Sequence, residues 1–92
     1  MALVTVRNLH GTSDNDPPEG YDSFQSFWED ETGREFGLCS CSTCIKDATC
    51  GAHVKKVYGG NEWYIVPLCD ECNKKDEDFE VPEDDLVPVN EK

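Results

Sequence analysis

The chain has 92 residues, of which 20 are acidic and 8 are basic, and its formal net charge is −12. A chain this short buries a limited core, so we expect one domain, 1–92, that needs a metal or disulfides for stability. The negative charge disfavours nucleic acid as a partner, because such binding rests on Lys and Arg contacts to phosphates. No stretch is long and apolar enough to span a membrane, and no signal peptide is visible at the start. We therefore expect a cytoplasmic monomer with no membrane partner.

The first elements expected along the chain are a strand and a loop. Residues 3–6 read Leu-Val-Thr-Val, which is a β-prone run. Residues 8–20 are rich in Gly, Pro, Asn, Asp and Ser, a composition typical of a loop. His10 in this loop is a candidate metal ligand. Because no cysteine lies near it at ligand spacing, we interpret it as a solvated histidine.

Residues 22–32 are predicted to form a helix. Asp22 or Ser23 can accept hydrogen bonds from its first turn, and Gly33 suits the left-handed position that follows a helix. Four aromatic residues recur at helical spacing and make one stripe: Tyr21, Phe24, Phe27 and Trp28. We interpret the stripe as core rather than as a binding surface, because a small domain has few other large apolar groups. We expect it to share one buried cluster with later apolar residues: Trp63, Ile65 and Leu68.

All the cysteines lie in one stretch, at Cys39, Cys41, Cys44, Cys50, Cys69 and Cys72. A cysteine group, an apolar stretch and then a Cys-x-x-Cys pair is the spacing of a tetrahedral zinc site. Disulfides are the alternative, but a cytosolic chain keeps its thiols reduced, which favours one structural Zn²⁺. The spacing predicts three ligands, namely Cys44, Cys69 and Cys72, with either Cys39 or Cys41 as the fourth. Cys50 is interpreted as a small buried hydrophobic residue, with a redox role as the alternative.

The 24 residues between Cys44 and Cys69 leave room for a β-hairpin. We predict strands at 52–58 and 63–68, a turn at 59–61 and a short helix that starts at Cys69. A cysteine turn, a hairpin and a helix, in this order, make a treble-clef zinc finger. The predicted fold class is therefore α+β, a small zinc-stabilised domain. Its treble-clef (ββα) core lies at 38–78, with an added N-terminal strand and helix.

The C-terminal part is predicted to carry an acidic segment at 76–85, with Phe79 anchoring it to the core. Residues 86–89 are expected to form an edge strand, and the neighbour considered for it is residues 3–6. We interpret the acidic runs as solvated faces, with docking of a basic partner as the alternative.

Three motifs carry a resemblance to a known family. They are Gly51-Ala52-His53-Val54, the strand Trp63-Tyr64-Ile65-Val66-Pro67-Leu68, and Cys69-x-x-Cys72-Asn73. The stretch 38–78 resembles the zinc-bound ββα core of the HNH nuclease superfamily. It resembles more closely small, uncharacterised bacterial proteins with a GAHV…WYIVPLC signature, and this likeness implies Cys39 rather than Cys41 as a zinc ligand. The nuclease likeness implies His53 as the general base and Asn73 as a residue that helps to hold a divalent ion.

The sequence departs from the nuclease pattern at several positions. Ala52 stands where the family has an acidic metal ligand. Tyr64 stands where it has an asparagine, and the nearest asparagine, Asn61, is out of register. A magnesium-like ion prefers oxygen ligands, so this set is incomplete.

We therefore predict a non-catalytic zinc-binding module that mediates interaction with a protein or, less readily, a nucleic acid. The alternative is a divergent HNH-type metal-dependent endonuclease that uses His53. In that case Asp76 or Asp78 would have to supply the missing ligand.

Overall fold

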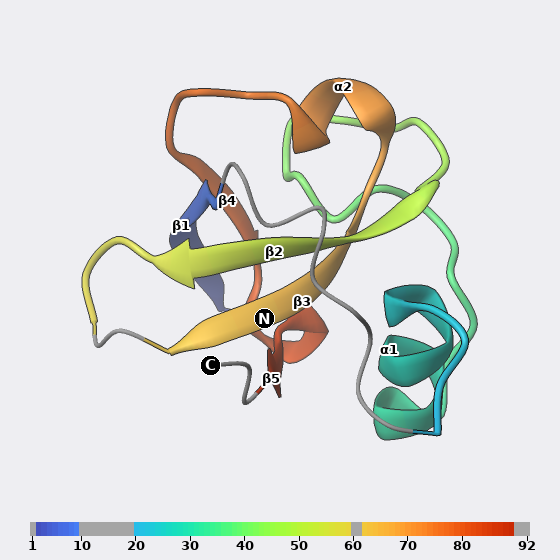
Figure 1. Ribbon diagram of the computed structural model, residues 1–92. Coiled ribbons are helices and arrows are strands. Elements are labelled where there is room, and N and C mark those ends of the chain that lie inside the picture. The colour runs from blue at the N-terminus through green and yellow to red at the C-terminus, as the bar shows by residue number, and fades with distance from the viewer. Residues whose placement is uncertain (1, 10–19, 60–61, 90–92) are drawn as a thin grey trace.

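The computed structural model describes residues 2–9, 20–59 and 62–89. In these ranges five strands form one antiparallel sheet with the order β4-β1-β2-β3-β5. The strands are β1 (Leu3–Asn8), β2 (Cys50–Lys56), β3 (Trp63–Leu68), β4 (Phe79–Pro82) and β5 (Val87–Val89). The helices are α1 (Phe24–Thr32) and the single turn α2 (Asp70–Asn73), with a 3₁₀ turn, η1, at Glu83–Asp85. Figure 1 shows α2 near one end of the β2–β3 hairpin and α1 beside the sheet. His10 and Asn61 lie outside the described residues.

Helix α1 ends where the sequence predicts and begins at Phe24, two residues after the predicted start, with Ser23 as its N-cap residue. Ser23 has an extended backbone, and its side chain accepts a hydrogen bond from the Ser26 N–H at 3.1 Å. Gly33 takes the left-handed conformation at φ 71°, and its N–H donates to the Glu29 carbonyl. The helix packs closely on β2 at Gly51, where an added Cβ would come within 2.9 Å of the Phe24 Cβ. Only glycine lets the two elements approach this closely.

The β2–β3 hairpin is confirmed, with Cys50 opposite Leu68 and Lys55 opposite Trp63. Strand β2 begins two residues before the predicted start and ends at Lys56 instead of residue 58. Strand β1 extends to Asn8, so the predicted loop does not begin at that residue.

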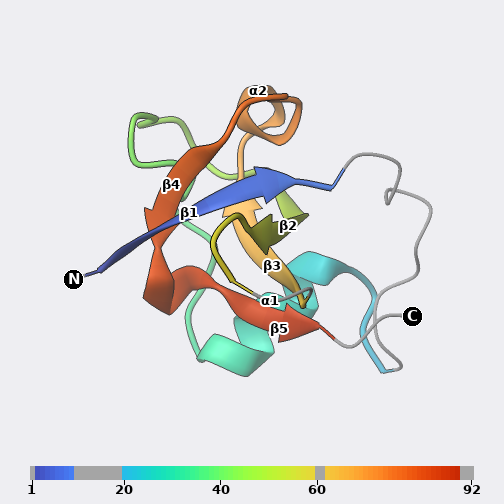
Figure 2. The same ribbon diagram turned by 90° about the vertical axis from the view of Figure 1, so that its left-hand side faces the viewer.

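The C-terminal strands differ from the prediction. The strand at Val87–Val89 does not lie beside residues 3–6; it pairs with β3, with Val89 opposite Trp63. The place beside β1 is taken by β4, which was not predicted as a strand. Strand β4 and turn η1 both fall within the segment 76–85. Phe79 and Val81 alternate with an exposed Glu80, so this segment buries one side despite its acidic composition. Figure 2 shows β4 and β5 on opposite edges of the sheet.

The apolar residues form two buried clusters, not the single cluster predicted. The cysteine-side cluster contains Val6, Cys39, Cys41, Ala52, Val54, Val66, Leu68, Cys69, Cys72, Phe79 and Val81. The helix-side cluster contains Phe27, Trp28, Ile65, Val87 and Val89, with the half-buried rings of Tyr21, Phe24, Phe36 and Trp63 against it. Adjacent residues of a strand point to opposite faces of a sheet, so Ile65 and Val66 belong to different clusters. Leu68 therefore does not join the aromatic residues.

Candidate metal centre

A closed loop, which we call the knuckle loop (residues 38–47), brings the first two cysteines of the site together. An isolated bridge pairs Leu38 with Asp47, and the Cys39 N–H donates to the Lys46 carbonyl at 2.7 Å. At the tip, the Cys44 N–H donates to the Cys41 carbonyl at 3.0 Å. These bonds fix the backbone on both sides of the tip, so the side chains of Cys39 and Cys44 lie on one loop of defined shape.

Helix α2 supplies the other two cysteines. Cys69 is its N-cap residue, and the Asn73 N–H donates to the Cys69 carbonyl at 2.9 Å. Cys72 is buried on the same turn, so both sulfurs leave one short element. A four-residue helix is not stable alone, because its hydrogen bonds do not offset the cost of nucleation. Its position therefore depends on what the cysteine side chains contact.

Polar contacts join the knuckle loop to α2 and to the end of β3. The Ser40 N–H donates to the Pro67 carbonyl at 2.8 Å. Lys46 forms an exposed ion pair with Glu71 on α2. Because Pro67 lies beyond the part of β3 that pairs with β5, its carbonyl is available to the loop.

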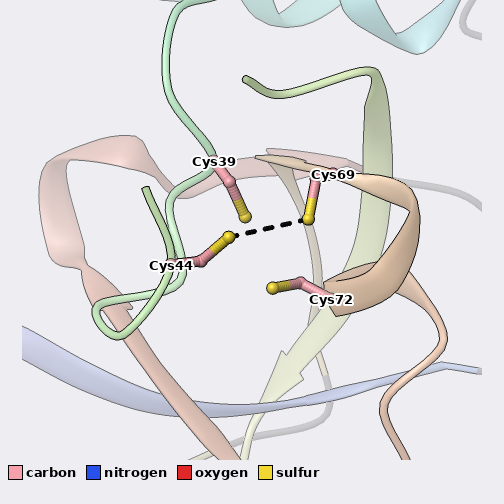
Figure 3. Close-up of side chains that lie close together, drawn as sticks. All are labelled: Cys39, Cys44, Cys69 and Cys72. Atoms are coloured by element: carbon pink, nitrogen blue, oxygen red, sulfur yellow. Dashed lines mark hydrogen bonds between the residues drawn. The ribbon is translucent and has the colours of Figure 1, made fainter. Parts of the chain in front are cut away.

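Four sulfur atoms converge between these elements. The Sγ atoms of the four-cysteine cluster all lie within 4.8 Å of one another, and its members are Cys39, Cys44, Cys69 and Cys72. The Sγ atoms of Cys44 and Cys69 are 3.7 Å apart. A tetrahedron with metal–sulfur bonds of about 2.3 Å has sulfur–sulfur edges of about 3.8 Å, so the cluster has the size of a metal–thiolate centre. Figure 3 shows the four side chains pointing toward a common centre.

Burial and mutual hydrogen bonds make the four thiols inequivalent. Burial is the main cause that raises the pKa of Cys39. The pKa of Cys72 is also raised, first by burial and then by its thiol neighbours. Burial would raise the pKa of Cys69 too, but hydrogen bonds from the Cys72 backbone and from the neighbouring thiols outweigh it and lower that pKa. A cation at the common centre of the four sulfurs would replace the thiol protons.

The other two cysteines lie outside this group. Cys41 is buried, with its Sγ 3.4 Å from the Thr43 hydroxyl and 3.9 Å from Lys75 Nζ. Cys50 is half-buried rather than buried, and its thiol donates to the Leu68 carbonyl at 3.4 Å. Burial raises the pKa of Cys50. All six cysteines are free thiols.

Sequence reasoning missed a buried amide that supports the site. The Asn8 side chain at the end of β1 is 5% exposed, and its Nδ2 donates to the Cys72 carbonyl at 2.8 Å and the Lys75 carbonyl at 3.1 Å. The Cys72 carbonyl lies in the last turn of α2, where it also accepts from the Lys75 N–H at 3.2 Å, and Lys75 follows the helix, so Asn8 ties β1 to the end of α2. The signal in the sequence was weak, since one asparagine after a β-prone run is common.

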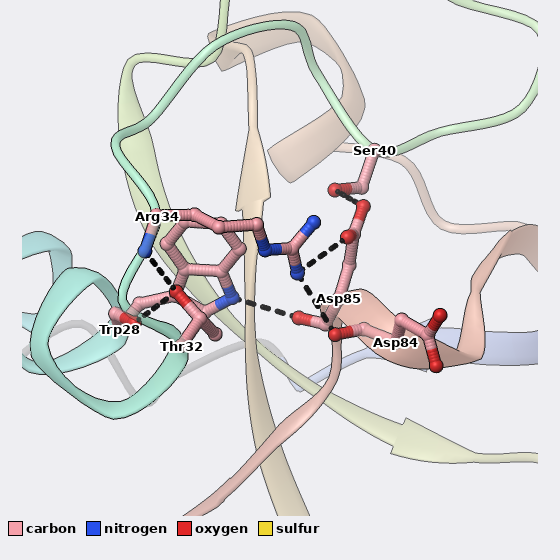
Figure 4. A network of polar contacts seen from close by, with 6 residues as sticks. All are labelled: Trp28, Thr32, Arg34, Ser40, Asp84 and Asp85. Carbon is pink, nitrogen blue, oxygen red and sulfur yellow. Dashed lines mark hydrogen bonds and ion pairs between the residues drawn. The ribbon is translucent and has the colours of Figure 1, made fainter.

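A second polar network, also missed, ties the knuckle loop to α1. Ser40 Oγ donates to an Asp85 carboxylate oxygen at 2.8 Å, and Arg34 forms an ion pair with the same carboxylate at 3.0 Å. The Trp28 indole N–H donates to the Asp85 carbonyl at 2.8 Å. Figure 4 shows that Asp85 is the shared partner of these side chains. The residue next to Cys39 is therefore linked through η1 to the helix on the other face of the sheet.

The residue expected as the general base of a nuclease site does not face the four-cysteine cluster. His53 is 7% exposed and lies on the α1 side of the sheet, with ring centroids 4.4 Å from Phe24 and 5.8 Å from Trp63. Its neighbours in β2, Ala52 and Val54, point to the cysteine side.

Asp76 and Asp78 are the acidic residues considered as replacements for the missing nuclease ligand, and Asp78 already has a partner. Asp78 forms an ion pair with Arg7 at 2.8 Å. The Asn73 backbone N–H belongs to the α2 turn, where it donates to Cys69.

The fold and the site define a small α+β domain with a cluster of four cysteines that can hold a metal ion. A scan against protein-family models, a search of curated proteins and a search of solved structures find no match to the chain. Across the described part of the chain, no helix is long and apolar enough to cross a membrane.

Proposed function

We propose that the chain is a non-catalytic zinc-binding module of the treble-clef type, in which the four-cysteine cluster holds one structural Zn²⁺. The observation that carries the proposal is the convergence of four sulfur atoms within 4.8 Å of one another. The treble-clef assignment is supported by the order of the elements, which is the knuckle loop, the β2–β3 hairpin and then α2.

The ligand chemistry favours zinc. Mg²⁺ and Ca²⁺ prefer oxygen ligands, whereas thiolates favour Zn²⁺, Cu(I) or iron–sulfur clusters. Four cysteines from a loop and a helix turn fill the four positions of a tetrahedral Zn²⁺ and leave none open for a substrate. This arrangement suits a structural ion, which contributes its binding free energy to folding.

Native mass spectrometry of the purified chain tests the metal. We expect one zinc ion per chain, lost in Cys69→Ser and kept in the control Cys50→Ser, because Cys50 lies outside the cluster. A wild-type chain that is metal-free with three disulfides would refute the proposal.

We also propose a protein as the partner of the module, in an intracellular setting. Leu38 and Ile45 on the knuckle loop are 63% and 87% exposed, which leaves two large aliphatic side chains on a loop fixed by hydrogen bonds. The charge of −12 favours a basic partner over a nucleic acid. Affinity capture with wild type, Ile45→Asp and the control Tyr58→Asp tests this surface, since Tyr58 is similarly exposed on the far end of the hairpin. A protein lost only with Ile45→Asp supports the proposal, and equal capture by all three opposes it.

A nuclease activity is not proposed, because His53 is enclosed by aromatic rings and faces away from the cysteines. A general base must reach the water or hydroxyl that it deprotonates. We expect no plasmid nicking with Mg²⁺, Mn²⁺ or Ni²⁺ at low salt. Metal-dependent nicking that His53→Ala abolishes would contradict this expectation, whereas nicking that persists in the variant would indicate a contaminant.

A further inference from the structure

Strand β5 is one edge of the sheet, and within the described residues no strand lies beyond it. The backbone groups of successive residues in a strand point alternately to its two sides. The Pro67 carbonyl of β3 accepts from the Ser40 N–H of the knuckle loop, so Pro67 points away from β2. Ile65, two residues earlier, points the same way and lies opposite Val87 of β5. Val87 therefore faces β3, and the Pro88 carbonyl points outward from the sheet.

This outer edge offers hydrogen-bond acceptors and no donors. Proline has no N–H, so Pro88 presents only its carbonyl. Leu86 has an extended backbone and points outward as well, but its N–H already donates to the Glu83 carbonyl at 3.1 Å. A partner strand alternates N–H and C=O groups along its length, and its carbonyls would find no donor here. The edge therefore disfavours an added strand and suits a group that only donates.

An open crevice of about 580 Å³ lies beside this edge, and we call it the β5 crevice. It is lined by Glu31, Thr32, Arg34, Asp84 and residues 86–88. Glu31 and Asp84 are exposed, and neither has an ion-pair partner in the described part of the chain. The charge of Arg34 is matched by Asp85, which lies 3.0 Å away. Two carboxylates thus leave the β5 crevice negative, so it attracts a cation.

The chain's own Arg34 shows which cation the acceptors of η1 can hold. Its Nη2 donates to the Asp84 carbonyl at 2.9 Å and pairs with the Asp85 carboxylate, and its guanidinium lies 5.0 Å from the centroid of the Trp28 ring (Figure 4). A guanidinium carries five N–H donors in one plane and no acceptor, so it can bond a carbonyl and a carboxylate together. A lysine ammonium has the same charge but lacks this planar fork.

We propose that the β5 crevice docks an arginine side chain of the basic protein partner proposed above, and this inference rests on that proposal. The guanidinium donates to the outward carbonyls of Leu86 and Pro88, and Glu31 and Asp84 supply the opposite charge. The partner then makes an apolar contact at the knuckle loop and a charged contact at the β5 edge. Neither contact uses the metal ion.

The test titrates short peptides into the purified, isotope-labelled full chain at low salt and follows its amide signals by NMR. The probes are three blocked pentapeptides, Gly-Gly-X-Gly-Gly, in which X is arginine, lysine or citrulline. Citrulline keeps the shape of arginine without its charge, and lysine keeps the charge without the planar fork. We expect the arginine peptide to shift the signals of residues 31–34 and 84–87 saturably. The lysine peptide should bind about threefold more weakly, and the citrulline peptide about tenfold or more.

Variants of the two carboxylates locate the contact. The double variant Glu31→Gln and Asp84→Asn should bind the arginine peptide about fivefold or more weakly, because it keeps the shape of the β5 crevice and removes its charge. The matched control is Glu80→Gln, which removes a carboxylate from the exposed face of β4 on the opposite edge of the sheet. The control should bind the peptide as the wild type does.

The results separate this inference from the proposed knuckle-loop surface. Equal affinity for the arginine and lysine peptides, shifts confined to other residues, or no saturable binding would overturn the β5 site. Loss of peptide binding in Ile45→Asp would also overturn it, because the arginine would then be bound at the knuckle loop. If the peptide binds the β5 crevice but no protein is captured through Ile45, only the knuckle-loop surface fails.

Discussion

The two faces of the sheet are stabilised by different means. On the helix side, α1 spans nine residues with a side-chain N-cap and a glycine C-cap, and it buries Phe27 and Trp28. On the cysteine side, the elements are the knuckle loop and the four-residue α2. The buried core beneath them contains four Val residues and one each of Ala, Leu and Phe, together with the thiols of Cys39, Cys41, Cys69 and Cys72.

The difference supports the proposal of a metal ion on the cysteine side. Aromatic side chains bury about 150–250 Å² each, so α1 can be held by apolar contacts alone. A loop and a single helical turn bury little, and their backbone entropy must be offset by another interaction. A metal–thiolate centre at the four-cysteine cluster would supply that interaction at one point, where the loop meets the helix turn.

The largest effect is expected from breaking the four-cysteine cluster. Cys72→Ser should lose the zinc and most amide chemical-shift dispersion, because both faces share β2 and β3 and the domain is small. Chelator treatment of the wild type should do the same, whereas Cys50→Ser should keep its dispersion. A chelated chain that stays fully dispersed would mean that the helix-side cluster suffices for folding.

On the helix side, we expect a smaller loss with the metal still bound. Trp28→Ala should cost about 3–5 kcal/mol through lost burial and the cavity left behind. Trp28→Phe should cost about 1–3 kcal/mol, since it leaves the Asp85 carbonyl without the indole N–H. Denaturant unfolding measures both, and native mass spectrometry should find zinc in each folded variant. Loss of zinc from a folded Trp28→Ala chain would show that the two faces are not separable.

Asn8 gives an intermediate test on the cysteine side. Asn8→Ala removes both hydrogen bonds to the end of α2, so we expect a loss of about 1–3 kcal/mol. Because one of these bonds is to Cys72 itself, zinc affinity measured by chelator competition should fall about 10–100-fold. Arg7→Ala is the control on the same strand, where the ion pair with Asp78 is exposed and contributes little to stability. Equal zinc affinity in both variants would remove Asn8 from the site.

The smallest effect concerns the rim of the helix side. The Tyr21 hydroxyl donates to Asp30 at 2.5 Å, and this bond is the main cause that raises the pKa of Tyr21. A folded pKa above the unfolded value of about 10 means that the contribution to stability is present below that pH and is lost as the pH rises through the folded value. Tyr21→Phe should flatten the alkaline part of the stability–pH curve slightly. An unchanged curve would show that the bond contributes nothing.

How far the sequence predicts the structure depends on how local the signal is. Ser23 and Gly33 act on their own helix, and the β2–β3 hairpin follows from strand composition and a nearby turn, so these elements were predicted. The gathering of Cys44, Cys69 and Cys72 was predicted from spacing. Spacing left Cys39 and Cys41 open, the resemblance favoured Cys39, and the three-dimensional loop brings Cys39 into the four-cysteine cluster.

The features that were missed depend on distant partners. The edge on which Val87–Val89 lies is set by competition with β4, and no local property of either strand decides it. Phe79 and Val81 carry a strand signal of only two residues within an acidic run. Asn8 and Asp85 have roles that exist only because α2 and the knuckle loop bring backbone groups to them.

Zinc K-edge X-ray absorption of the purified chain tests the central claim most directly. The account predicts four sulfur neighbours at about 2.3 Å and no nitrogen or oxygen neighbour in the first shell. The same spectrum should be obtained for Cys41→Ser and Cys50→Ser, because neither thiol belongs to the four-cysteine cluster. A first shell with a nitrogen or oxygen ligand, or one that changes in Cys41→Ser, would contradict the assignment of the four-cysteine cluster as the zinc site.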